Sequence, residues 1–197
     1  VPMAMDKVTV CNMALAQLGA SPISAMTDEP HGPLCDLFYD GARRGVLLED
    51  AWRCAILREK IEDDGTSVPD DRGFAYRFKL SDLTKCLQIL DVTGTDGTSI
   101  RWLREGEYLY ADYDTLVVRH VTDLDDEAKW HPLLVEVVSL RLAAAIAVRV
   151  KASMTAKAQL MQEYEALLLR ARQINAIEVN DPNDMEEGGS EWIDSRS

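Results

Sequence analysis

The segment HPLLVEVVSLRLAAAIAVRV (residues 131–150) decides the organisation of the chain, because it reads as one helix at the centre of the molecule. Pro132 suits the first position of a helix, where its missing N–H costs little. Leucines, valines and an isoleucine occupy nearly every angle around the axis, so we expect neighbours on most sides. Glu136, Arg141 and Arg149 would each cost a few kcal/mol in hydrocarbon, which argues against a membrane span. Alanines in the second half let helices of the same or another subunit approach closely.

Three other helices are predicted around this segment from apolar residues at spacings of three and four. They run from about Lys7 to Leu18, from Pro33 to Trp52 and from Thr155 to Ile177. Gly41 and Gly45 each cost about 1 kcal/mol of helix propensity relative to Ala, so they indicate a close helix contact. The broad apolar side of this second helix contains Leu34, Leu37, Phe38, Ala42, Leu48 and Trp52.

Between Arg53 and Val121 the apolar period changes to roughly two, which predicts strands. Turns rich in Asp and Gly separate the strands, and we expect them to form a small antiparallel sheet. Trp52 is expected to be buried where the second helix meets this sheet, as the anchor between helices and strands. The strands are predicted at 54–61, 76–80, 86–92, 100–103, 107–111 and 116–121.

Charge is the most informative total of the composition. The chain has 21 Lys and Arg against 34 Asp and Glu, a net charge of −13, which is the opposite of a nucleic-acid-binding protein. Four cysteines lie far apart in apolar stretches without a C-x-x-C motif, so we expect reduced thiols in the core. The first residues, VPMAMDKV, lack a basic region followed by an apolar one, so we expect no secretory signal and first use in a cytoplasm.

No metal, cofactor or catalytic motif is predicted. The histidines lie in three separate segments, at His31, His120 and His131, and none has a ligand partner at helical spacing. Acids precede the central helix, and capping together with the helix dipole explains them. These acids are Asp123, Asp125, Asp126 and Glu127.

The final twenty residues, 178–197, form an acidic tail. They carry seven acids against one Arg and two adjacent glycines, a composition that predicts disorder. Trp192 and Ile193 are bulky residues within this polar segment, and we treat them as a candidate docking pair for a neighbouring subunit or a partner.

Together these patterns predict an α+β fold. It combines an antiparallel bundle of about four helices with an inserted small antiparallel β domain and a disordered acidic C-terminal tail. The predicted division is 1–52 and 122–177 for the helical part, 53–121 for the β domain and 178–197 for the tail.

Three stretches and their order resemble the phage head-to-tail adaptor family, which includes tail tubular protein A and P22-type tail accessory factors. In NMALAQLGASPIS (12–24) a helix ends in Leu-Gly before a Pro-containing turn. In ARRGVLLEDAWRCA (42–55) Trp52 closes the second helix, and HPLLVEVVSLRLAAAIAV (131–148) is the central helix. The segment RFKLSDLTKCLQILDV (77–92) also looks like the family's strand, loop and strand.

This resemblance implies a structural protein and not an enzyme. It implies a self-assembled ring of roughly twelve copies below the portal protein of a virion, which extends the DNA channel, helps to retain packaged DNA and attaches the tail nozzle or tail tube protein. Genomic DNA would pass through without specific binding, and roughly twelve chains at −13 each would carry about −156 charges that repel phosphate. We expect the isolated chain to be monomeric in the host cytoplasm during assembly.

Two other classes of protein remain open from the residues alone. A cell-wall-acting tail hydrolase would need acids such as Asp70, Asp71 or Asp112 as general acid and base. An acidic cytoplasmic interaction protein or chaperone shares the composition but does not require this order of elements.

Overall fold

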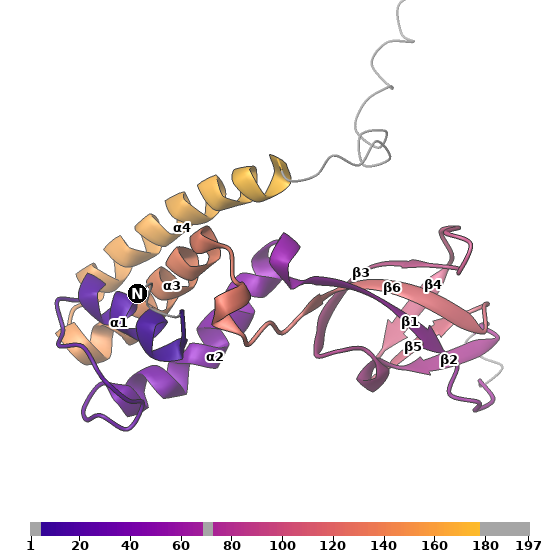
Figure 1. The fold of residues 1–197 in the computed structure, drawn as a ribbon, viewed down its shortest axis with the longest axis horizontal. Helices are drawn as coiled ribbons and strands as arrows, with labels where there is room; N and C mark the ends of the chain where they lie inside the picture. Colours follow the sequence, from indigo (N-terminus) through magenta and orange to yellow (C-terminus); the bar gives the residue numbers. More distant parts are fainter. Residues whose placement is uncertain (1–4, 69–72, 178–197) are drawn as a thin grey trace, which may run out of the picture.

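The computed structural model describes residues 5–68 and 73–177. It is α+β, with four α-helices and two small antiparallel sheets in this part of the chain. Figure 1 shows an elongated molecule with the helices at one end and the strands at the other. We call these the helical part and the β part. The helices are α1 (Lys7–Gln17), α2 (Gly32–Glu49), α3 (Pro132–Lys151) and α4 (Met154–Ile177).

The central position of α3 is the main feature of the helical part, because α1, α2 and α4 all pack against it. Pro132 stands at its start, where His131 Nδ1 accepts a hydrogen bond from the N–H of Leu133 at 3.2 Å. The helix ends where Ala152 adopts a left-handed conformation with φ 52°. The predicted helix over 131–150 is therefore present, with one residue of difference at each end.

Local side-chain bonds define the ends of α1. Asp6 accepts the N–H of Thr9 at 2.8 Å and caps the first turn, while Gly19 follows the helix with φ +57°. The amide of Asn12 then holds the loop, because it donates to the carbonyl of Ile23 at 2.9 Å and accepts from its N–H at 2.8 Å. The chain after α1 is thereby fixed against the helix that precedes it.

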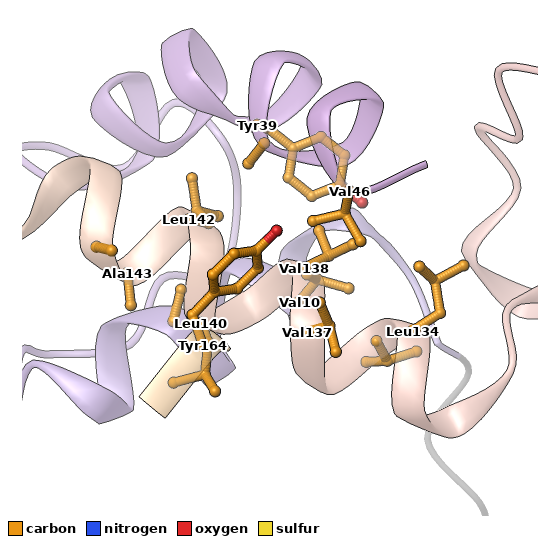
Figure 2. Packing of buried hydrophobic residues seen from close by; sticks show 14 of the residues in the cluster. Val10, Tyr39, Val46, Leu134, Val137, Val138, Leu140, Leu142, Ala143 and Tyr164 are labelled. Carbon is orange, nitrogen blue, oxygen red and sulfur yellow. The ribbon is translucent and has the colours of Figure 1, made fainter. Parts of the chain in front are cut away.

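One continuous apolar cluster fills the helical part (Figure 2). Tyr39 and Val46 of α2 and Val10 of α1 meet Val138 and its neighbours on α3, and Tyr164 enters from α4. Eleven residues of α3 are buried, including the small side chains Ala143, Ala144 and Ala147. This distribution follows from the absence of a polar face on α3.

The β part contains two three-stranded antiparallel sheets, with strand orders β1-β6-β3 and β2-β5-β4. A second apolar cluster draws on both sheets and includes Phe78, Leu109, Leu116 and Val118. The six predicted strands are all present, but they form two sheets, where a single sheet was expected. The bounds are β1 (Ile56–Glu62), β2 (Tyr76–Lys79), β3 (Cys86–Thr93), β4 (Trp102–Glu105), β5 (Tyr108–Ala111) and β6 (Thr115–Thr122).

The predicted apolar side of α2 is wrong in two places. Leu37 and Leu48 are 72% and 47% exposed, whereas Cys35, Tyr39 and Val46 are fully buried. The predicted close contact at the glycines is also not found within the described chain, because a Cβ added at Gly41 or Gly45 would meet nothing within 4 Å. Of the other predicted residues, Ala42 and Trp52 are buried and Leu34 and Phe38 are partly buried, so the buried face overlaps the predicted side but is centred nearer Tyr39.

Candidate functional site

A buried ion cluster joins the helical part to the β part. Asp123, directly after β6, receives two hydrogen bonds from Arg43 of α2 at 3.0 and 3.1 Å and one from Arg44 at 2.7 Å. The side chains of Arg43 and Asp123 are 7% and 10% exposed. Asp40 adds a second partner for Arg43 at 3.1 Å. This bidentate geometry fixes the angle at which α2 meets the strand that leads to α3.

The acids around Asp123 serve tertiary contacts, so the prediction that they cap a helix start is wrong. Asp125 pairs with Lys85 at 2.5 Å, next to β3, and Glu127 accepts the hydroxyl of Tyr39 on α2 at 2.6 Å. Asp126, the residue before the 3₁₀ turn η4 (Glu127–Lys129), makes no side-chain cap and pairs with Lys129. The acids therefore tie the connection between β6 and α3 to α2 and β3.

Trp52 lies between α2 and the 3₁₀ turn η1 (Arg53–Ala55) that leads into β1. It is 1% exposed, and its Nε1 donates to the carbonyl of Val46 at 2.9 Å. Asn175 of α4 closes the same corner, since its side chain accepts from the N–H of Arg53 at 3.0 Å and donates to the carbonyl of Ala51 at 3.0 Å. Trp52 belongs to the apolar cluster of the helical part, together with Val121 of β6.

A smaller polar cluster connects Glu59 of β1 to His120 of β6 and to Thr84, which lies two residues before β3. Glu59 accepts hydrogen bonds from the N–H and hydroxyl of Thr84 at 2.7 and 2.6 Å, and it lies 2.8 Å from Nε2 of the fully buried His120. Burial alone would raise the pKa of Glu59, but the bonds from Thr84 and the contact with His120 outweigh it and hold this pKa below its ordinary value of 4.5.

The outer face of α2 carries exposed apolar and small residues beside a charged one that bonds Asp123. Leu37, Gly41 and Leu48 are exposed at positions that share one side of the helix, with Arg44 between them. The open space at Gly41 means that the glycine costs helix stability without an intramolecular contact to explain it. A surface helix ordinarily carries charged and polar residues on this side.

One strip on the outer face of α4 is uncharged in a chain that is 28% charged, and the exposed Glu165 borders it. Gln162, Ala166, Leu169 and Gln173 follow one another at helical spacing, and all four are exposed. Leu169 is 61% exposed and lies at the middle of this strip. The helical spacing of these uncharged residues is readable in the sequence.

These two faces point in opposite directions. Both α2 and α4 bury their inner sides against α3, which lies between them in Figure 1. The structure therefore offers two different exposed surfaces that contain leucine, on opposite sides of the helical part, and neither is covered by another described element. We call them the α2 surface (Leu37, Gly41, Arg44, Leu48) and the α4 surface (Gln162, Ala166, Leu169, Gln173).

Of the other candidates from the sequence, the docking pair Trp192 and Ile193 lies outside the described residues, as do Asp70 and Asp71. Asp112 accepts the N–H of Ala75 at 3.1 Å and so joins the residue after β5 to the residue before β2. In residues 5–68 and 73–177 no group of three or more His, Cys, Asp or Glu side chains is arranged to hold a metal ion. In the same ranges no helix has the length and hydropathy needed to span a membrane.

Comparison with models of known protein families gave no match, and neither did a search of curated proteins.

Proposed function

We propose that this protein is a structural head-to-tail adaptor of a tailed bacteriophage, which assembles as a ring of roughly twelve copies below the portal protein. The observation that carries the proposal is the pair of surfaces with exposed leucines on opposite sides of the helical part. The resemblance of residues 12–24, 42–55 and 131–148 to this family supports it independently. We further propose that the helices form a bundle into which 53–121 is inserted as a β domain.

Two different surfaces on one chain favour a ring. When the α2 surface of one copy binds the α4 surface of the next, the contact is heterologous, and heterologous contacts produce a closed ring if the rotation between copies closes. Leu37 and Leu48 would pack beside Leu169, and Gly41 would let the two helices approach closely. Alanines and glutamines opposite them bring no unpaired charge into the interface.

The charge of the chain suits a DNA channel. A ring of such subunits is strongly acidic, and an acidic lumen repels phosphate, so genomic DNA passes without specific binding. In this proposal the helical part faces the portal, the β part faces the tail nozzle or tail tube protein, and Trp192 and Ile193 of the tail contribute to docking. The protein would act in the virion without catalysis.

Charge substitutions at the two surfaces test the proposal. Leu37→Asp and Leu169→Asp should each leave the isolated chain folded, because both side chains are exposed, and each should abolish ring formation on a portal. Leu103→Asp on β4 is the matched control, since Leu103 is also exposed but lies in the β part. Light scattering of chain and portal mixtures measures the outcome. Normal rings from either surface variant would contradict the assigned surfaces, and failure of the unaltered chain to bind any portal would contradict the adaptor function.

A further inference from the structure

The β part contains a hollow of about 650 Å³ at the end of the β2-β5-β4 sheet where the hairpin joins β4 to β5. Its walls come from the end of β2 and the 3₁₀ turn η3 (Leu80–Asp82), from the start of β3, and from the β4–β5 hairpin around Gly106. The lining residues are Lys79, Leu80, Ser81, Leu83, Lys85, Cys86, Arg104, Gly106, Glu107 and Tyr108.

The charge of this hollow is opposite to that of the chain. Three cations and one acid line it, in a protein whose net charge is −13. Lys85 reaches Asp125 at 2.5 Å, whereas Lys79 and Arg104 make no ion pair within the described residues. Leu80, Leu83 and Tyr108 supply an apolar wall beside these cations. A ligand that fits this lining combines carboxylates with bulky apolar side chains.

Residues 178–197 of the same chain have that chemistry. They contain seven acids and one Arg, and Trp192 with Ile193 lies among the acids. Twenty residues extend to at most about 65–70 Å, nearly twice the length of α4. The segment starts after Ile177, at the end of α4 that lies toward the β part in Figure 1, so the hollow is within its reach.

We propose that the acidic segment 178–197 binds in the basic hollow formed by Lys79, Lys85 and Arg104. Its carboxylates pair with the cations, and Trp192 packs on the apolar wall. The ligand class is an acidic peptide with an aromatic anchor. This inference rests on the hollow and its charge and does not depend on the adaptor function, because the binding needs no portal.

Zero-length coupling of amines to carboxyl groups by a carbodiimide, read by mass spectrometry on the full chain, tests the proposal. We expect Lys79 and Lys85 to couple to acids of 178–197. The bond between Lys85 and Asp125 serves as the internal positive control. Lys60 on β1 and Lys157 on α4 lie outside the hollow and should show little coupling to the segment. An equal mixture of ¹⁴N and ¹⁵N chains tells whether the segment comes from the same copy or another.

A double variant with reversed charges tests whether the cations of the hollow are responsible for the coupling. Lys79→Glu with Arg104→Glu should reduce coupling between Lys85 and the segment about tenfold, as expected when two exposed ion pairs are removed. Arg58→Glu with Lys60→Glu makes the same change of charge on β1 and should leave that coupling intact. Coupling spread evenly over all lysines, or unchanged by the first pair, would overturn the proposal. Coupling of Lys79 only to acids outside both 178–197 and the hollow, which itself contains Glu107, would assign another occupant and also overturn it.

Discussion

At the scale of the residue, Asp123 connects the β part to the helical part through its bonds to two arginines of α2. It is one carboxylate with two arginines, and most of the pair it forms with Arg43 is removed from water. Removing one member of such a pair leaves a charge buried without compensation, which costs more than the pair contributes. The acid therefore matters for the folded state although it carries no chemistry.

Replacement of Asp123 by Asn should lower the free energy of unfolding by about 3–5 kcal/mol, because Arg43 would stay buried without a full counter-charge. Urea denaturation measures this loss. Asp126→Asn is the matched control and should change stability by less than about 1 kcal/mol, since its pair with Lys129 is exposed. Equal losses of unfolding free energy in both variants would show that the burial of Asp123 does not determine its contribution to stability.

Trp52→Ala should cost about 3–5 kcal/mol, since it empties a buried site at the corner of α2, η1 and α4 and removes the bond to Val46. Trp52→Phe keeps most of the volume and should lose clearly less. Denaturation midpoints of the two variants check this. A midpoint for Trp52→Ala equal to that of the parent would refute an anchoring role.

The lowered pKa of Glu59 makes part of the stability depend on pH. Because the pKa is below 4.5 in the folded state, the stabilisation is present above that value and is lost as pH falls through the folded pKa. The difference in free energy of unfolding between the parent and Glu59→Gln should therefore shrink as pH falls below about 4.5. Glu62→Gln, on the same strand, is the control. A difference that stays constant with pH would argue against this linkage.

At the scale of the element, sequence patterns predicted which segments are helices and strands, because those signals are local, although α2 ends three residues before the predicted Trp52. Pro132 and Gly19 mark helix ends through their backbone geometry, and Asp6 does so through its side chain. The face that each helix buries depends on its neighbours, and this is where Leu37 was misplaced. Asp123 was misread for the same reason, because its partners lie about eighty residues away on α2.

Substitution of Gly41 tests the role of the α2 surface through two measurements, the stability of the isolated chain and ring formation. Gly41→Ala should stabilise the isolated chain by about 0.5–1 kcal/mol, because Ala is the better helix former and its Cβ would meet open space. The same methyl group should weaken ring formation if a neighbouring helix approaches closely there. Gly45→Ala on the same helix is the control, because it makes the same change into open space and lies outside the named α2 surface. A stabilised variant that assembles normally would remove Gly41 from the interface.

At the scale of the whole molecule, the subunit is elongated, exposes leucines on two opposed surfaces and carries a large negative charge. The fold class was predictable because periods of 3.6 and 2 alternate along the chain in long blocks. The α4 surface was missed because a search for apolar stripes passes over uncharged polar ones such as Gln162 and Gln173. Net charge opposes association of free subunits, so we expect a template to be needed for assembly.

The most direct test of the adaptor proposal is the mass, by multi-angle light scattering, of the full chain alone and with the portal protein of the virus that encodes it. We predict a 22.0 kDa monomer alone, and on the portal an added mass of about 260 kDa from roughly twelve chains. A stable closed ring at micromolar concentration without the portal would contradict templated assembly, and a chain that stays monomeric beside the portal would contradict the function.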